Sequence, residues 1–337
     1  MSETTPYPEF RDVAASLTRM GLSREGEQFG IAKLSGGVSG DVWRVTLKRG
    51  EVCVKRALGK LRVTEDWRAP PERSETEAAW FRFAASVDAK CVPAILGEDP
   101  THHMFAMEYF PPGRFPVWKG ELAAGRIDPD FAARVGSAIA RIHAASAGNA
   151  RIEKEFVTQA QFHALRIEPY LLFTASRHED VAPRIRSLAQ SVAGARIALM
   201  HGDVSPKNIL CGGPVFLAAE TACYGDPAFD LAFCLNHLLL KCVWHPEFAG
   251  EYLGCFMALK RSYLHGVSWE DAETLDTRAA ALLSAFLLAR IDGKSPVEYL
   301  TDEDDKAFVR GMAKTFLFEN LSLDALAEGW REALPQK

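Results

Sequence analysis

The sequence predicts an α+β protein with two lobes, a sheet-rich N-terminal lobe and a larger helical lobe. Short strand-like segments are concentrated before residue 108. Tyr109–Gly113 then contains two prolines and a glycine, which break regular structure. Beyond that break, apolar residues recur at helical spacing over long stretches. We therefore place the N-terminal lobe at residues 1–108, a hinge at 109–113 and the helical lobe at 114–337.

Composition narrows the classes of protein that fit. A chain of 337 residues is long enough for two substantial cores, and 48% hydrophobic with 25% charged residues is typical of a globular protein. The net charge of -5 argues against a nucleic-acid partner, which needs a basic face. The longest apolar run, Ala279–Ala289, is too short to span a bilayer, so no membrane partner is expected. Seven scattered cysteines without a C-x-x-C pair indicate reduced thiols in a cytoplasmic protein.

The N-terminal lobe should begin with a short amphipathic helix at 9–21, followed by strands at 31–34, 41–47 and 52–55. A glycine-rich turn separates the first two strands. Glycines allow backbone amides to approach phosphate oxygens closely, although a plain hairpin turn has the same composition. The candidate phosphate-binding residues of this turn are Gly36, Gly37, Ser39 and Gly40.

Lys55 lies at the end of an apolar strand, about where a kinase-type lysine binds phosphates. A cation in such a strand needs a partner, because an unpaired buried charge is costly. The helix expected at 74–85 supplies Glu75 and Glu77, which face different sides of the helix. The residues alone leave both carboxylates open as the partner.

Further strands at 91–96 and 104–108 should complete a five-stranded antiparallel sheet. In the helical lobe, Asp226-Pro227 is a strong helix start, and the nearly all-apolar helix after it should be central. Other helices are expected at 131–143, 156–170, 181–192 and 268–291 and from 301 onward, with strands within 197–218.

The segment His201–Asn208 carries the clearest chemical signal. Phosphoryl transfer from ATP needs a carboxylate for the proton of the acceptor hydroxyl and an amide oxygen for a magnesium ion. Asp203 and Asn208 stand at the D-x-x-x-x-N spacing of kinase-type catalytic loops. An H-G-D triplet is also a good turn sequence, so a plain turn is the alternative.

Together with Val215–Asp230, this segment resembles the aminoglycoside phosphotransferase and choline kinase superfamily, including its methylthioribose kinase branch. In that family H-G-D-x-x-x-x-N is followed by a strand bearing D-x-E and then by G-D-P-x-x-D. The chain has Gly225–Asp230 in full, but Ala218-Ala219-Glu220 stands where D-x-E belongs. The segment Arg62–Arg73 is similar to an extra loop of the methylthioribose kinase branch.

The resemblance implies a bilobal, protein-kinase-like fold and ATP- and magnesium-dependent phosphorylation of a hydroxyl on a small molecule. ATP and GTP are not distinguished by the sequence, and no oligomeric state is indicated. The implied roles are catalysis by Asp203; metal binding by Asn208 and Glu220; phosphate binding by Lys55, paired with Glu77; and adenine recognition by the backbone of Glu108 and Phe110. Structural roles are implied for His201, Asp226 and Asp230, the last accepting hydrogen bonds from the loop backbone. Candidate substrate-binding residues are Arg166, Arg290 and Lys294, for which surface or helix-capping charges are the alternative.

Ala218 leaves the family's main metal-binding carboxylate missing. Glu220 lies two residues on, on the same face of the strand, and is expected to compensate in part. An inert nucleotide- or metabolite-binding pseudokinase is the rival hypothesis, and an alanine introduced into an active enzyme is a third. A protein kinase fits poorly, because seven residues between Ala218 and Asp226 leave no room for an activation segment.

Overall fold

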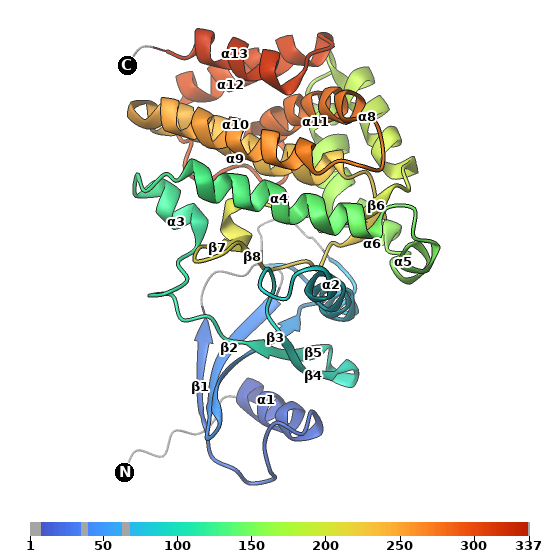
Figure 1. The fold of residues 1–337 in the computed structure, drawn as a ribbon, viewed down its shortest axis with the longest axis vertical. Coiled ribbons are helices and arrows are strands. Elements are labelled where there is room, and N and C mark those ends of the chain that lie inside the picture. Colours follow the sequence, from blue (N-terminus) through green and yellow to red (C-terminus); the bar gives the residue numbers. More distant parts are fainter. Residues whose placement is uncertain (1–7, 35–39, 63–67, 336–337) are drawn as a thin grey trace. The chain divides into compact units, whose positions relative to one another are not determined.

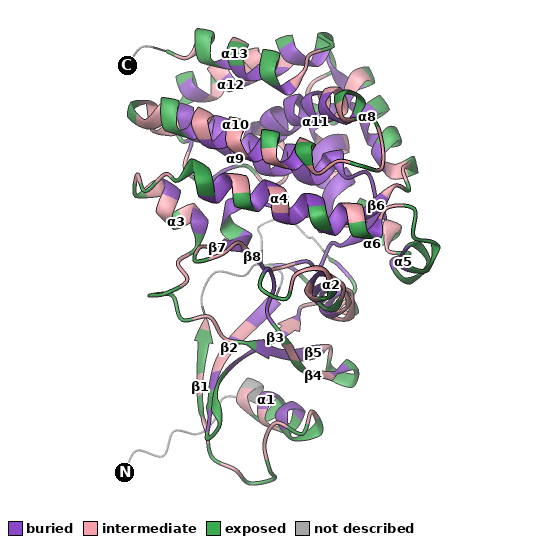
Figure 2. Ribbon diagram, viewed as in Figure 1, coloured by how far each residue is buried: buried purple, intermediate pink, exposed green. Residues whose placement is uncertain are grey.

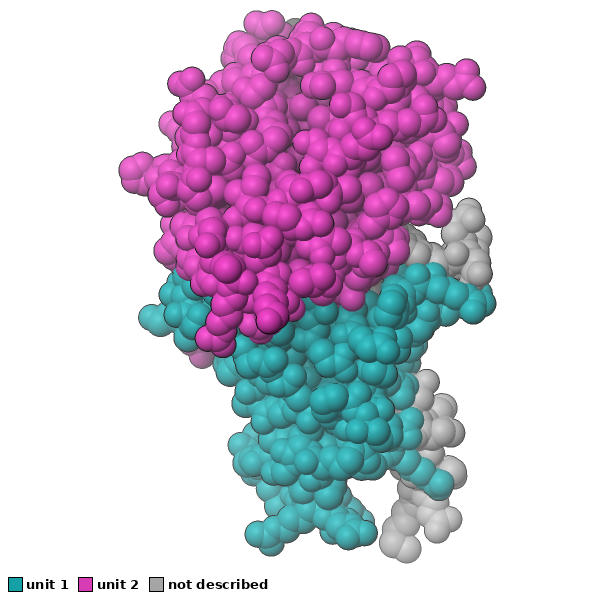
Figure 3. All heavy atoms as spheres, turned by 90° about the vertical axis from the view of Figure 1, so that its right-hand side faces the viewer, with its two compact units in different colours: residues 1–111 teal, residues 112–337 magenta. Residues whose placement is uncertain are grey.

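The computed structural model describes residues 8–34, 40–62 and 68–335, and the chain forms two compact units, Met1–Pro111 and Pro112–Lys337 (Figure 3). The boundary falls within the Tyr109–Gly113 break. The α+β fold class is confirmed, with an antiparallel five-stranded sheet in unit 1 and mainly helices in unit 2 (Figure 1). Three candidate phosphate-binding residues, Gly36, Gly37 and Ser39, lie outside the described residues.

The sheet of unit 1 has the strand order β1-β2-β3-β5-β4, with every neighbouring pair antiparallel. The predicted strand at 91–96 is displaced, because Pro93 has no N–H for a ladder hydrogen bond and β4 begins after it. The elements are α1 (Pro8–Arg19), β1 (Gly30–Leu34), β2 (Gly40–Leu47), β3 (Gly50–Ala57), α2 (Arg73–Val87), β4 (Ile95–Asp99), η1 (Pro100–His102) and β5 (Met104–Glu108).

Strand β3 has different partners on its two faces. Val54 belongs to a core cluster with Val13 and Leu17 of α1. Successive side chains of a strand point to opposite faces, so Lys55 leaves that cluster and points to the other side. Its ammonium group meets Glu77 of α2 there. The alternation of side chains along β3 therefore places the Lys55 ammonium group against α2.

Unit 2 is built around α9 (Ala228–Trp244), whose residues from Ala228 to Val243 are all buried (Figure 2). It packs against α10 and α11, so the expectation of a central apolar helix is confirmed. The other helices are α3 (Trp118–Ala123), α4 (Pro129–Ser146), α5 (Ala150–Glu155), α6 (Gln159–Phe162), η2 (His163–Leu172), α7 (Phe173–Arg177), α8 (Ala182–Gly194), η4 (Pro246–Phe248), α10 (Ala249–His265), α11 (Ala272–Asp292), α12 (Glu303–Phe318) and α13 (Leu323–Ala333).

The helix predicted at 156–170 is divided. It begins at Gln159 as α6 and continues into η2, which is π-helical and contains Pro169. Proline lacks the N–H for a normal helical hydrogen bond, and a wider turn accommodates the loss. The π-helical segment carries Arg166. None of the described helices combines the length and apolar character needed to cross a membrane.

Two small ladders hold the segment that contains the candidate catalytic loop. Strand β6 (Ala198–Met200) pairs with β9 (Cys223–Gly225), and β7 (Ile209–Leu210) pairs with β8 (Val215–Phe216), with η3 (Pro206–Asn208) before β7. Strand β8 ends at Phe216, two residues before Ala218. The expected continuation through Glu220 is therefore wrong, and strand alternation cannot put Glu220 on the face of residue 218.

Candidate functional site

Gly202 brings the His201–Asn208 loop close to the segment after Ala218. Its φ angle is +78°, a left-handed conformation that favours glycine, and a Cβ here would lie 2.5 Å from the carbonyl oxygen of Thr221. The hydroxyl of Thr221 donates to the carbonyl of His201 at 3.3 Å. The glycine of the H-G-D triplet thus permits a close approach that any side chain would block.

Asp230 holds the loop from beneath. Its carboxylate is fully buried in α9 and accepts hydrogen bonds from the backbone N–H of His201 at 2.7 Å and of Gly202 at 2.8 Å. The ring of His143 adds a third contact at 3.2 Å. Asp226 acts at the start of the same helix, where it accepts from the backbone N–H of Ala228. It also forms a bidentate pair with Arg278 at 2.8 and 2.9 Å.

These contacts make Asp230 a stability determinant. Asp230→Ala should lower the free energy of unfolding by about 1–3 kcal/mol, because it leaves buried backbone donors without an acceptor. Urea denaturation followed by tryptophan fluorescence measures this change in the free energy of unfolding. Glu179→Ala removes an exposed carboxylate from the same unit and should cost less than about 0.5 kcal/mol. Equal, small effects of the two substitutions would contradict the assignment.

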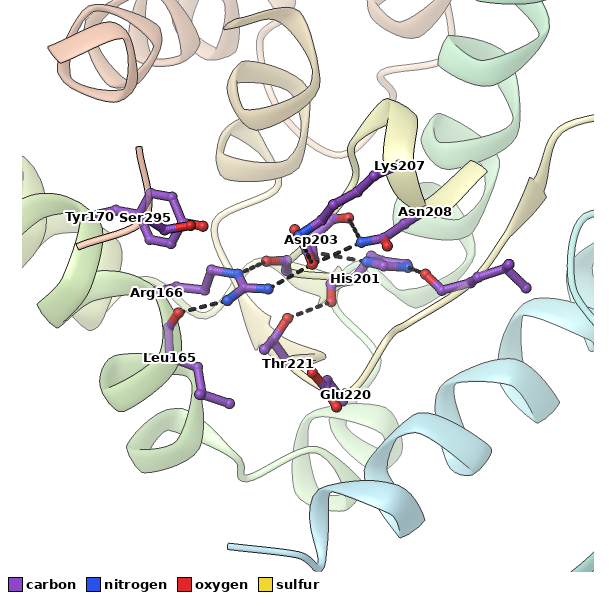
Figure 4. Close-up of polar contacts among 12 residues, drawn as sticks. Leu165, Arg166, Tyr170, His201, Asp203, Lys207, Asn208, Glu220, Thr221 and Ser295 are labelled. Carbon is purple, nitrogen blue, oxygen red and sulfur yellow. Dashed lines mark hydrogen bonds and ion pairs between the residues drawn. The ribbon is translucent and has the colours of Figure 1, made fainter. Parts of the chain in front are cut away.

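Asp203 has two carboxylate oxygens in different situations (Figure 4). Its Oδ2 accepts from Asn208 Nδ2 at 2.8 Å and pairs with Arg166 at 2.9 Å and with Lys207 at 3.4 Å. Its Oδ1 is buried and has no hydrogen-bond partner among the described residues. One oxygen is therefore fixed in place by three groups, and the other is available to accept a hydrogen bond.

The charge states of Asp203 and His201 follow from their surroundings. Burial alone would raise the pKa of Asp203, but the charges of Arg166 and Lys207 outweigh it, and the pKa lies below the ordinary value. Burial lowers the pKa of His201, which keeps the imidazole neutral. Its Nδ1 accepts from the N–H of Asp203 at 3.1 Å, so Nε2 carries the proton and donates to the carbonyl of Leu217 at 3.0 Å.

The sequence left Arg166 as a substrate-binding candidate or a surface charge, and its burial contradicts the surface alternative. It is buried on η2, and it donates to the carbonyls of Gly202 and Leu165 at 2.6 Å besides pairing with Asp203. These contacts tie Arg166 to the His201–Asn208 loop. An arginine within the apolar run from Leu165 to Ile167 was the available signal, because such a charge requires a partner.

The other two basic candidates diverge. Arg290 is buried and donates to the hydroxyls of Tyr170 at 3.4 Å and of Ser295 at 3.1 Å. Lys294 instead pairs with Glu168 at 2.8 Å. Its ammonium group lies 5.4 Å from the ring centre of Phe173. Arg290 therefore faces the interior of unit 2, and Lys294 belongs to a partly exposed ion pair.

The candidate metal ligands are incompletely assembled. Asn208 donates both its amide hydrogens to Asp203, at 2.8 and 3.0 Å, which leaves its side-chain oxygen for a cation. Glu220 is buried in a turn, and Figure 4 shows its side chain apart from Asn208. Ala218 supplies no oxygen and has a left-handed φ of +62°. No group of three or more His, Cys, Asp and Glu that suits a metal ion occurs within the described part of the chain.

Unit 1 holds the candidate phosphate-binding lysine. Lys55 Nζ lies 2.7 and 2.9 Å from the two carboxylate oxygens of Glu77, and both side chains are buried. Glu75, the other candidate, pairs with His103 at 3.0 Å. Gly40 opens β2, and a Cβ there would lie 2.8 Å from the carbonyl oxygen of Arg56. The N–H of Glu108 donates to the carbonyl of Ala94, and Phe110 is the second residue after β5.

Comparison with solved structures supports the fold. An aminoglycoside phosphotransferase from Alicyclobacillus acidocaldarius has 16% sequence identity and a TM-score of 0.51, with 98% of this chain and 97% of that chain covered. An ethanolamine kinase from Plasmodium vivax has 11% identity, a TM-score of 0.55 and coverages of 98% and 91%. A choline kinase from Cryptosporidium parvum has 11% identity, a TM-score of 0.51 and coverages of 96% and 95%.

Sequence comparison supplies the family. No curated protein matches the chain. The sequence model of the phosphotransferase enzyme family matches residues 30–254, which is more than half of the chain. This range contains Lys55, Asp203, Asn208 and Asp230. The chain is a member of the phosphotransferase enzyme family.

Proposed function

We propose that this protein is an ATP- and magnesium-dependent kinase that phosphorylates a hydroxyl group of a small molecule. The observation that carries the proposal is the geometry of Asp203. Three groups fix its Oδ2, and its Oδ1 is buried without a partner among the described residues. A plain turn would not need such an arrangement. A hydroxyl group that donates to Oδ1 would be oriented for attack on a phosphoryl group.

The reaction would transfer the terminal phosphoryl group of ATP. The acceptor oxygen forms a bond to the γ-phosphorus, and the bond from that phosphorus to the β,γ-bridging oxygen breaks, so that ADP leaves with the electron pair. Asp203 accepts the hydroxyl proton. Because its pKa is lowered, Asp203 is a weak base, and its main contribution is orientation, with proton transfer late in the reaction.

The residues present fit a magnesium ion for which the protein supplies only some of the ligands. Asn208 has a side-chain oxygen that can bind a cation. Glu220 is the glutamate of the family's D-x-E motif, and Ala218, at the position of its aspartate, has no ligand atom. Magnesium commonly keeps several water ligands and binds nucleotide phosphates, so Asn208 together with the nucleotide would hold the ion weakly. When bound, the ion would neutralise charge on the phosphoryl oxygens.

The substrate nucleotide would also use unit 1. Lys55 is held by Glu77 in a fixed position, which suits a point charge that meets phosphate oxygens. The backbone near Glu108 and Phe110 is proposed to recognise the adenine edge. The acceptor is not defined by the fold, because the structural neighbours named above are kinases of different acceptors.

A catalytically inert nucleotide-binding protein is the second candidate, and the observation that favours it is Ala218. An alanine has no oxygen with which to bind a metal at this position. Both candidates predict nucleotide binding. They differ in turnover, and they differ in what a carboxylate at position 218 would do.

Nucleotide binding is tested by thermal shift with a non-hydrolysable ATP analogue. Saturation at about 100 times the Kd should add about 2.7 kcal/mol of stability to the protein. Lys55→Met should weaken binding at least about tenfold, because a charged phosphate contact is lost. Each variant is compared with its own ligand-free melting temperature, since the substitution also leaves Glu77 buried without its cation.

Lys48→Met is the matched control, because it removes an exposed lysine from the turn between β2 and β3. Its nucleotide affinity should equal that of the unmodified protein. No nucleotide-dependent shift at millimolar concentration would refute the proposed function. An equal loss of affinity in both variants would refute the role of Lys55.

A further inference from the structure

A small cavity in unit 2 adjoins the catalytic loop, and its lining is strongly basic. Glu298 is the single carboxylate of the lining, and it is exposed and pairs with Lys119. This basic character contrasts with the net charge of -5 of the whole chain. The titratable lining residues besides Glu298 are Lys119, Lys207, His237, Lys241, Arg290 and Tyr299.

Lys241 is the least expected member of this lining. Its side chain projects from α9 and is only 1% exposed, yet Nζ has no hydrogen-bond partner among the described residues. The ring centres of Trp244 and Tyr299 lie 4.7 and 4.8 Å from Nζ. Aromatic faces attract a cation, but they do not replace the hydrogen bonds that the ammonium group loses on burial. Burial lowers the pKa of Lys241 to about 8.

Two groups near Lys241 are likewise buried without a hydrogen-bond partner among the described residues. They are Nε of Arg290 and the hydroxyl of Tyr299. Buried polar groups in folded proteins are satisfied almost without exception, and several unsatisfied donors around one cavity point to a ligand. All three groups donate hydrogen bonds, and two of them are cations. The complementary ligand is therefore a hydrogen-bond acceptor with negative charge.

The positive electrostatic potential of the cavity also favours a ligand with negative charge. The pKa of His237 lies well below its ordinary value, first because of burial and then because of the charges of Arg290, Lys207, Lys241 and Lys119. A neutral imidazole in this position adds no further positive charge. A cationic acceptor would meet net repulsion at this cavity, whereas an anionic one would be attracted.

We propose that the cavity binds a carboxylate of the acceptor molecule, so that the protein phosphorylates a hydroxy acid. This proposal rests on the proposed kinase function and names its substrate class. The cavity measures about 40 Å³, which accommodates a group the size of a carboxylate but not a sugar ring. The remainder of the acceptor, with its hydroxyl, lies outside the cavity.

The cavity is linked to Asp203 by direct contacts. Lys207 lines it, and the Nζ of the same residue lies 3.4 Å from Asp203 Oδ2. Arg290 donates to the hydroxyl of Tyr170, whose ring lies 5.8 Å from the guanidinium of Arg166. Arg166 in turn pairs with Asp203. The proposal places the carboxylate of a short hydroxy acid beside Lys241 and its hydroxyl toward Asp203.

Matched ligands test the proposal by calorimetry on nucleotide-free protein. The set consists of glycerate, glycerol and ethanolamine, and of gluconate, glucose and glucosamine, so that each acid is compared with a neutral and a cationic analogue. Only the acids should bind. Lys241→Met should weaken acid binding at least tenfold, and Lys241→Arg should restore part of it. Lys154→Met removes an exposed lysine of unit 2 and should change nothing.

Stability separates a binding role from a structural one. Lys241→Met replaces an unsatisfied buried cation by an apolar side chain of similar length, so the ligand-free melting temperature should stay equal or rise. Binding of alcohols or amines as tight as that of the acids would overturn the proposal, as would acid binding that survives Lys241→Met. Nucleotide is absent from these titrations, so their failure leaves the thermal-shift test of the kinase function independent.

Discussion

Ala218→Asp should raise the turnover of the protein by about 10²–10⁴-fold with a suitable acceptor. In the resembling family this position supplies a carboxylate to the metal on the transferring phosphates. An alanine methyl cannot coordinate a cation, and magnesium requires oxygen ligands in near-octahedral geometry. Preorganised charge at the phosphoryl group is usually the largest single contribution to such catalysis. Steady-state turnover, measured against magnesium concentration, should also show tighter magnesium dependence in the aspartate variant.

The backbone at position 218 already suits an aspartate. The φ angle of +62° places Ala218 in the left-handed region, which costs an alanine about 1–2 kcal/mol and which Asp and Asn adopt more readily. The neighbouring residue fixes this conformation. The N–H of Leu217 donates to the carbonyl of Asn208 at 2.8 Å, and its carbonyl accepts from His201. Ala218→Asp should therefore fold at least as well as the unmodified chain.

Ala218→Gly is the matched control, because glycine relieves the same backbone strain without adding an oxygen. It should leave turnover unchanged, so that any gain in the aspartate variant is assigned to the carboxylate. An aspartate variant that binds ATP but stays silent across a broad panel of hydroxyl acceptors would favour the inert nucleotide-binding protein. An alanine form as fast as the aspartate form would show that residue 218 is not at the metal.

The family and the fold class were predictable because their signals are local in sequence. Asp203 and Asn208 stand five positions apart in one loop, and Gly225–Asp230 follows within thirty residues. Strand alternation likewise separates Lys55 from Val54. Each of these relations involves residues of one short chain segment, so the spacing of the residues in the sequence is enough to predict it.

Relations across the chain were not predictable in the same way. Arg166 reaches Asp203 from a π-helical segment, and no periodicity indicates a π turn. The end of β8 before Ala218 depends on contacts of Leu217 with the His201–Asn208 loop, which override the strand-like run of residues. The cavity at Lys241 combines residues of α3, η3, α9 and α11 with the segment after α11. Tertiary packing decides all three.

Asp203→Asn should lower the turnover of the Ala218→Asp enzyme by about 10²–10⁴-fold, because the neutral amide orients the acceptor hydroxyl less well and takes no proton. An amide oxygen can still accept a hydrogen bond, but it takes no proton and carries no charge. Single-turnover kinetics with saturating ATP and acceptor measure the chemical step directly. Nucleotide affinity should stay within about twofold of the parent, because Lys55 and its surroundings in unit 1 are unchanged.

The stability of the same variant separates catalysis from folding. The pKa of Asp203 is lowered in the folded protein, so its ionised form adds stability above the ordinary pKa of about 3.9, and that stability is lost as the pH falls through the lowered value. The asparagine variant lacks this contribution at neutral pH and leaves buried Arg166 without its carboxylate partner, so it should unfold about 1–3 kcal/mol more easily. Arg166 keeps its bonds to the carbonyls of Gly202 and Leu165, which limits the loss. If Asp203→Asn instead unfolds the protein at ambient temperature, the His201–Asn208 segment is a structural turn and not a catalytic loop.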